Sequence, residues 1–199
     1  MRVAFKEWAI IVEALMQGEQ ILILRKGGIR EGNGGFKIDH KRFLLFPTLF
    51  HQQRESVIPK AQDRFDQISP FFPSETEVDF LGHAELVGWK QIEDMNQIRD
   101  LQHLHIWKPE VIEERFNWGA EQSISLLAVR AHRLFEPIRL PMVPEYGGCK
   151  SWIDSVVDID IEDTFPALTD DAFSEQIEEL EMLVGDLETE LPSTNASQP

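Results

Sequence analysis

Cysteine is nearly absent from this sequence, and a single Cys149 excludes two common uses of the residue. One cysteine cannot form a disulfide within the chain, and it cannot build a zinc site from several thiolates. Long apolar runs are also absent, because no stretch approaches the roughly 18 uncharged apolar residues that a membrane-spanning helix needs. Lys6, Glu7 and Glu13 interrupt the N-terminal stretch, where a signal peptide would have an apolar core. These absences predict a cytoplasmic protein without a membrane partner.

Basic residues are missing from the last quarter of the chain. Residues 153–199 contain 14 of the 35 acidic residues and no lysine or arginine, whereas residues 1–152 hold all 19 basic residues against 21 acidic ones. The net charge of −16 therefore belongs mainly to the tail, and the nearly neutral body can still carry a basic face. The overall acidity does not exclude a nucleic-acid ligand.

Hydrophobic periodicity predicts a globular mixed α+β domain over residues 1–157. Helical spacing of apolar residues, or a capping residue, predicts helices over 5–16, 48–55, 90–101 and 109–117. Short apolar runs predict strands over 20–26, 42–47, 78–89, 123–136 and 149–157. The first two strands are interpreted as a wide hairpin or a pair of neighbours. Because strands and helices do not alternate regularly, we expect a curved or barrel-like sheet flanked by helices.

The tail predicts a separate unit appended to this domain. Residues 158–168 are expected to be a linker, 169–191 an acidic amphipathic helix, and 192–199 a disordered end. The apolar residues of the helix repeat every three or four positions, as in a coiled coil: Phe173, Ile177, Leu180, Val184, Leu187 and Leu191. Three heptads are marginal alone, so this stripe needs a partner, which is either the body or another chain.

The segment 25–42 is basic and rich in glycine. It includes Arg25, Lys26, Gly27, Gly28 and Arg30. Glycines let the backbone approach an anion closely while amides and guanidinium groups donate hydrogen bonds, so a phosphate-bearing ligand could bind here. The segment lacks the ending of a P-loop and the GxGxxG pattern, and a solvated connecting loop is the alternative interpretation.

Two further basic positions extend this hypothesis. Strand alternation places Arg130 and His132 on one face of the predicted strand 123–136, where they either mark an exposed end or line a pocket. Lys150 follows a paired glycine and Cys149. If the sheet is curved, these side chains and the basic segment could converge on one anion-binding concavity.

Histidine and cysteine chemistry gives weaker signals. The pairs Asp39 with His40, His51 with Glu55, and His103 with His105 suggest metal ligands, but none matches a known motif, so no metal site is assigned. His51 follows the turn at Pro47 and is the candidate for an acid or base. Cys149 is either a nucleophile, for which no histidine partner is evident, or a small packed side chain.

Several stretches together resemble a known bacterial family, frequent in cyanobacteria, called domain of unknown function 1802. They are FKEWAIIVEAL, ILILRKGGIRE, FLLFPTLFHQ, HIW and YGGCKSWI. The resemblance covers about residues 4–157 and implies a single bacterial domain ending near Val157. It carries no reaction, cofactor or catalytic residue. It does fall on the positions selected above, including Arg25, His51 and Lys150.

Three functions are compatible with these patterns. The first is a module that binds an anionic ligand, either a nucleotide or nucleic acid, with the acidic tail as a regulatory arm. The second is a hydrolase or nuclease that uses His51 with Asp39, Glu55 or a metal ion. The third is an adaptor that binds a protein partner, or itself, through residues 173–191. No nucleophile, base and orienting group are visible as a set, so the sequence leaves open whether the protein is an enzyme.

Overall fold

Seven strands form one sheet in the part of the chain that the structure, a computed structural model, describes: residues 1–26, 36–49, 53–71, 74, 76–119, 121–148 and 150–192. The strands are β1 (Val3–Trp8), β2 (Leu22–Arg25), β3 (Arg42–Thr48), β4 (Glu77–Ile92), β5 (Ile124–Pro141), β6 (Trp152–Asp154) and β7 (Thr164–Pro166). Their order is β2-β5-β4-β3-β1-β6, and β7 pairs with β5.

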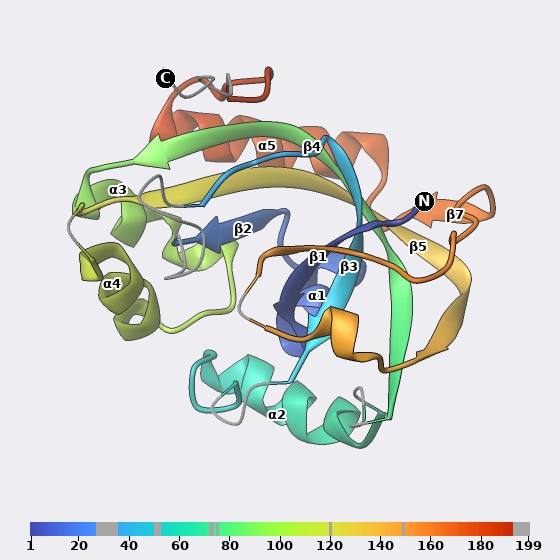
Figure 1. The fold of residues 1–199 in the computed structure, drawn as a ribbon. Helices are drawn as coiled ribbons and strands as arrows, with labels where there is room; N and C mark the ends of the chain where they lie inside the picture. Colours follow the sequence, from blue (N-terminus) through green and yellow to red (C-terminus); the bar gives the residue numbers. More distant parts are fainter. Residues whose placement is uncertain are drawn as a thin grey trace, which may run out of the picture.

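The antiparallel pair of β4 and β5 is the longest feature of the sheet and arcs across the whole molecule (Figure 1). The pairing changes register between Phe80 and Gly82 and again between Leu86 and Gly88. Such bulges bend a strand and increase its twist. At Gly82 a Cβ atom would lie 2.0 Å from the carbonyl oxygen of His132, so only glycine fits this bend.

The sheet is open, but its two ends approach each other. β2 lies at one end and β6 at the other. The Nη2 atom of Arg25, the last residue of β2, donates a hydrogen bond of 3.1 Å to Ser151 Oγ, just before β6. The predicted mixed α+β domain with a curved sheet and flanking helices is therefore confirmed.

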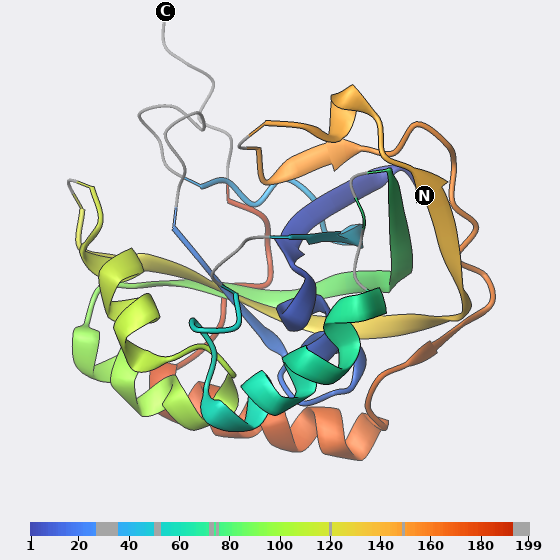
Figure 2. The ribbon, with the colours of Figure 1, turned by 90° about the horizontal axis from the view of Figure 1, so that it is seen from below.

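Five α-helices accompany the sheet in the described part of the chain: α1 (Ala9–Met16), α2 (Pro59–Ile68), α3 (Met95–Asp100), α4 (Pro109–Asn117) and α5 (Asp170–Val184). Figure 2 shows α2, α4 and α5 on one side of the molecule and the segment with β6 on the other. Pro59 and Pro109 stand in the first turns of α2 and α4, where a missing N–H costs no helical hydrogen bond. None of the described helices is long and apolar enough to cross a membrane.

The expected hairpin of the strands over 20–26 and 42–47 is wrong. β2 pairs with β5, while β3 lies between β1 and β4, so two long strands separate them. Local sequence patterns identify strands but do not specify which strands pair. Here β4, with 16 residues, and β5, with 18 residues, lie between β2 and β3.

The first third of the expected helix over 5–16 is a strand. Its first residues belong to β1, and only Ala9–Met16 are helical. β1 lies between β3 and β6, and its four central residues are buried. A strand buried on both faces shows no alternation, so its periodicity cannot be distinguished from that of a helix.

Other predicted boundaries also shift. Thr48 ends β3 instead of starting a helix, and the described residues 53–56 form a turn before α2 begins at Pro59. The strand expected to end at Trp89 continues to Ile92, which delays α3 to Met95. Asp94 caps that helix, accepting a hydrogen bond of 2.8 Å from the backbone N–H of Asn96.

The acidic C-terminal helix packs on the body. Within α5, Leu180 and Val184 are fully buried in the main core, and Ile177, Leu187 and Leu191 pack against it from α5 and the segment that follows. The apolar stripe predicted from the sequence is thus used within the chain. The helix ends at Val184 instead of residue 191, because Gly185 takes a φ of +77°, which favours glycine.

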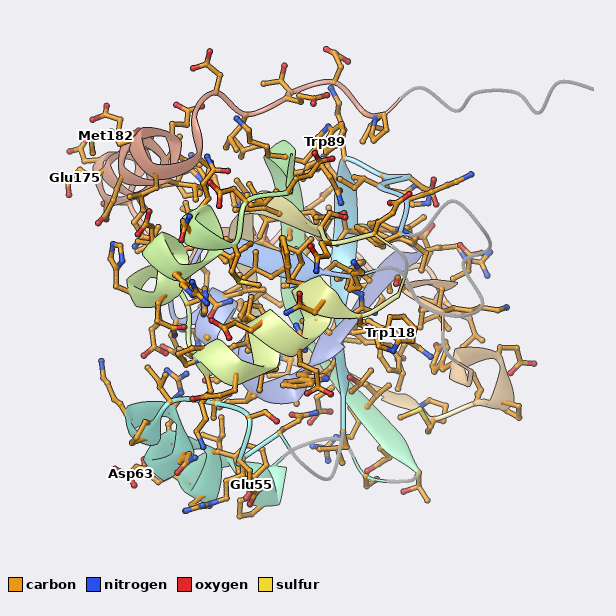
Figure 3. The ribbon with its side chains drawn as sticks, turned by 90° about the vertical axis from the view of Figure 1, so that its left-hand side faces the viewer. Glu55, Asp63, Trp89, Trp118, Glu175 and Met182 are labelled. Carbon is orange, nitrogen blue, oxygen red and sulfur yellow. The ribbon has the colours of Figure 1, made fainter. Side chains whose placement is uncertain are left out.

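Backbone pairing continues beyond this helix. Trp89 and Glu188 exchange two backbone hydrogen bonds of 2.9 Å, and the indole of Trp89 donates to the Glu190 carbonyl (Figure 3). Residues 158–168, expected as a linker, contain β7, which adds a short strand beside β5. The division of the chain at residue 157 stays a prediction.

Two substitutions on α5 test this packing. Leu180→Ala should lower the free energy of unfolding by about 2–5 kcal/mol, because it leaves a cavity in the core. Met182→Ala is the matched control, since Met182 is 79% exposed on the outer side of the helix (Figure 3), and it should change stability by less than about 0.5 kcal/mol. Urea denaturation measures both, and equal effects would show that the helix is not part of the core.

Candidate anion-binding site

Several segments singled out in the sequence meet at one end of the sheet. β1 and β3 are parallel, so their carboxyl ends lie together, with Trp8 opposite Thr48. β6 runs antiparallel to β1, which brings its start, near Ser151, to the same end. Arg25 at the end of β2 arrives there as well, through its hydrogen bond to Ser151. The curvature of the sheet therefore assembles residues that are up to 144 positions apart, from Glu7 to Ser151.

A buried carboxylate lies at the base of this region. The side chain of Glu7 is fully buried, and its Oε1 accepts a hydrogen bond of 2.7 Å from the backbone N–H of Trp8. Its Oε2 lies 3.7 Å from Nη1 of Arg25 and has no hydrogen-bond partner among the described residues. A buried charge of this kind is stable only beside opposite charge.

The second cation beside Glu7 is Arg115 on α4. Its guanidinium lies over the ring of Trp8, 4.6 Å from the ring centre, and over Trp107 at 5.3 Å, and its Nη1 donates to the carbonyl of Leu24. Burial lowers the pKa of Arg115 to about 10, and the negative charge of Glu7 opposes this shift. Arg115 is therefore still positively charged at neutral pH.

Arg25 is held on three sides. Its Nε and Nη2 donate to Ser151 Oγ at 3.3 and 3.1 Å, its Nη1 faces Glu7, and its guanidinium carbon lies 5.3 Å from the ring centre of Phe5. The side chain is still 23% exposed. A guanidinium carries five N–H donors, so Arg25 combines a fixed position with donors that a ligand can reach.

Lys6 adds another positive charge to this end of the sheet. Its Nζ donates to the carbonyl of Gly148 at 3.1 Å, and it lies over the ring of Phe46. Gly148 has a φ of +81°, a backbone conformation that favours glycine. Strand alternation directs Lys6 to the face of β1 opposite Glu7, where Phe46 belongs to the second hydrophobic cluster.

Aromatic rings lie directly beside Arg25. The ring of Phe5 contacts Arg25 and also packs edge-on against Trp152, with 4.8 Å between ring centres. Phe36 stacks on Trp152 at 6.4 Å, and His40 meets the same indole edge-on. Phe36, His40 and Trp152 are partly exposed, while Lys37 and Lys150 beside them in the chain are exposed. We name these six residues the Arg25–Trp152 surface: Arg25, Phe36, Lys37, His40, Lys150 and Trp152.

Lys26 is occupied by the protein itself. Its Nζ donates to the carbonyls of Phe116, Glu121 and Ser123, which uses all three N–H groups of the ammonium. Burial lowers the pKa of Lys26. Its position indicates that it ties the end of β2 to the segment between α4 and β5.

Arg130 lies apart from these residues. Ser125 is opposite Arg25 in the sheet, and Arg130 is five residues further along β5, about 16 Å away at roughly 3.3 Å per residue. Its guanidinium bonds Asp170 at the start of α5 and lies over the ring of Phe173, so it contacts the tail helix.

Several sequence candidates fall outside the described residues. They are Gly27, Gly28, Arg30, His51 and Cys149. The anion-binding role of the glycines and Arg30, and the acid–base role of His51, stay predictions. So do the alternatives for Cys149.

The pairs that suggested metal ligands gather no third ligand among the described residues, and His51 of the pair with Glu55 lies outside them. His103 is exposed and lies 2.9 Å from Glu179 of α5, whereas the neighbouring His105 is buried. Burial lowers the pKa of His105 to about 4. Asp39 and Glu55 are both exposed (Figure 3 labels Glu55).

A different histidine pair does gather. His83 on β4 and His132 on β5 are directly opposite each other, and Glu85 lies next to them. Sequence reasoning missed this group because its members are up to 49 residues apart and on two strands. Strand alternation predicts that His83 and Glu85 share one face of the strand. Only the register of β4 and β5 shows that His132 joins them.

The family of the chain is established by its sequence. The chain matches the family described as Domain of unknown function (DUF1802) over residues 4–179, and it therefore belongs to that family. The resemblance inferred from the sequence motifs is confirmed, and the matched region reaches into α5. No curated protein matches the sequence.

Among solved structures, the fold is similar to crystal structures of ASCH from Zymomonas mobilis. One of them has 11% sequence identity and a TM-score of 0.44, and the alignment covers 88% of this chain and 93% of that chain. A tyrosine-to-phenylalanine mutant of the same protein has 12% identity and a TM-score of 0.44, with 88% and 96% covered. A likeness of this degree carries no information on the activity of this chain.

Removing the buried charge should destabilise the site strongly. Glu7→Gln preserves shape but leaves Arg25 and Arg115 without their counter-charge, and we expect a loss of about 3–5 kcal/mol in the free energy of unfolding. Glu175→Gln, on the exposed side of α5 (Figure 3), is the matched control and should be nearly neutral. Chemical denaturation of both variants decides this, and a neutral effect of Glu7→Gln would contradict the charge cluster.

Proposed function

We propose that this member of the DUF1802 family binds an anionic ligand, a nucleotide or single-stranded nucleic acid, at the Arg25–Trp152 surface. The observation that carries the proposal is the contact of one ring, Phe5, with both the Arg25 guanidinium and the Trp152 indole. A fixed cation and a partly exposed aromatic ring thus lie side by side.

Arg25 supplies the phosphate-binding chemistry. Guanidinium groups bind phosphate through two parallel hydrogen bonds, and a pre-positioned guanidinium loses little entropy on binding. The contacts with Ser151, Glu7 and Phe5 hold Arg25 in place before a ligand arrives. Two exposed lysines add charge near Trp152. Lys150 is two residues before it in the chain, and the Lys37 carbonyl accepts a hydrogen bond of 2.8 Å from the Trp152 indole.

Trp152 and its neighbours supply the base-binding chemistry. Proteins that bind single strands combine a basic track for the backbone with aromatic side chains on which bases stack. Phe36 and Trp152 are nearly parallel, with 16° between their planes, and both are partly exposed. A base can therefore meet an aromatic face here while its phosphate contacts a cation.

The C-terminal tail supports a regulatory role in this proposal. Glu190 lies 3.4 Å from Lys41, which follows His40 of the Arg25–Trp152 surface. An acidic segment beside Lys41, at the edge of the Arg25–Trp152 surface, competes with a ligand phosphate for nearby cations. In contrast, the apolar stripe of α5 packs on the body, which leaves the adaptor hypothesis without that stripe as a free partner surface.

The proposal predicts salt-dependent binding that two exposed lysines control. The test measures fluorescence anisotropy of labelled single-stranded RNA and DNA with the full chain over a range of salt concentrations, with ATP as a competitor. The double variant Lys37→Gln/Lys150→Gln should weaken binding. It should also reduce the slope of log affinity against log salt by about 0.7 for each phosphate contact that is lost.

Matched controls separate this effect from general charge. Lys60→Gln/Arg139→Gln removes the same two charges from α2 and the far part of β5, where Lys60 is 83% and Arg139 62% exposed, and should change the slope little. Arg25→Gln should lower affinity further, provided that its circular dichroism shows a folded protein. Wild-type protein that binds neither strand nor ATP at low salt, or equal losses in both double variants, would overturn the proposal.

A further inference from the structure

We infer that His83, His132 and Glu85 form a binding site for a divalent transition-metal ion, with Zn²⁺ as the ion that these ligands suit best. The site lies on the paired strands β4 and β5 and shares no residue with the Arg25–Trp152 surface. It stands independently of the proposed nucleic-acid function.

The geometry of the two histidines is set by the sheet. His83 and His132 are opposite each other in the register of β4 and β5, and their rings stack with 4.8 Å between centres and 8° between planes. Glu85 is two residues beyond His83, so its side chain leaves the same face of the strand. One ligand atom from each of the three side chains lies within 4.8 Å of the other two.

Three of the four ring nitrogens of this pair are buried without a hydrogen-bond partner in the described part of the chain. His83 is 1% exposed, and both its Nδ1 and Nε2 are buried without a hydrogen bond among the described residues. Nε2 of His132 is in the same condition. A buried polar group that lacks a hydrogen-bond partner destabilises the folded protein. A single bound metal ion would coordinate one nitrogen of each ring.

The set of donors fits zinc. Two imidazole nitrogens and one carboxylate oxygen are a common three-ligand set for Zn²⁺, with a fourth position open to water or a further ligand. Bonds of 2.0–2.2 Å in a tetrahedral site put ligand atoms about 3.4 Å apart, so the three side chains must draw together by about 1 Å. Glu85 can move, because its side chain is 37% exposed, and its exposure also gives an ion a path from solvent.

Nearby cations oppose metal binding, but most of them are already paired. Arg130, opposite Glu85, bonds Asp170, and the N-terminal ammonium bonds Asp158. Arg42 is the direct competitor, because its Nε lies 2.8 Å from Oε1 of Glu85. The Arg42 side chain is 56% exposed and can turn to solvent when an ion takes the carboxylate.

The test uses the full chain after dialysis against a chelator. Isothermal titration with Zn²⁺ should show one equivalent bound, and Co²⁺ should give the intense visible absorption of a tetrahedral site. His132→Gln and Glu85→Gln should each weaken binding by at least about 10–100-fold, the range seen even for residues that only support metal ligands. Arg42→Gln should tighten binding, because it frees Glu85 and removes a positive charge.

His103→Gln is the matched control. His103 also lies beside a carboxylate, Glu179, but it is exposed and has no second histidine in its pair, so its removal should leave the affinity unchanged. His83→Asn completes the set if it folds, and the two less buried ligands decide the matter if it does not. The inference is overturned if wild-type protein binds no stoichiometric Zn²⁺. Equal binding by His132→Gln, Glu85→Gln and His103→Gln would also overturn it.

Discussion

The burial of one carboxylate constrains how this end of the molecule is built. Glu7, the next-to-last residue of β1, is fully shielded from water, and a charge in that position is tolerated only with cations close by. Arg25 comes from the opposite end of the sheet and Arg115 from α4 to meet this need. Two guanidinium groups therefore gather around one carboxylate in this part of the protein. The same interaction that joins β1, β2 and α4 therefore leaves a cation at the surface.

The carboxylates of the acidic tail are held against the rest of the chain. The acidic tail does not hang free, since Leu180 and Val184 of α5 lie in the main core and Trp89 pairs with Glu188. Its carboxylates therefore have fixed places, such as Asp170 at Arg130 and Glu190 at Lys41. The body keeps its own cations around Arg25 and Lys150. The pI of about 4.7 therefore reflects mainly the acidic tail, because residues 1–152 carry nearly equal numbers of basic and acidic residues.

The sequence predicted the kinds of elements better than their partners. The fold class, most strands, α4 and the acidic helix follow from apolar spacing, proline position and capping residues. The hairpin of β2 and β3 does not, because strand pairing depends on β4 and β5, which lie far away in the chain. The strand β1 was taken for helix because both of its faces are buried.

The candidate site shows the same limit. Arg25 and Lys150 were selected from local composition, whereas Glu7, Arg115 and Trp152 gained their roles only through the curvature of the sheet. Lys26 looked equivalent to Arg25 in the sequence, yet three backbone carbonyls occupy its ammonium. The histidine pair on β4 and β5 was hidden for a similar reason, since it depends on strand register.

The most direct measurement of the central claim is an NMR titration of the protein with a short single-stranded oligonucleotide. The five tryptophans give five indole N–H signals, and Arg25 adds a side-chain Nε–H signal. The account predicts that the signals of Trp152 and Arg25 shift together and saturate at the same ligand concentration. The signal of Trp118, which is 46% exposed and is not part of the Arg25–Trp152 surface, should stay in place. A shift at Trp118 with none at Trp152 and Arg25 would contradict it.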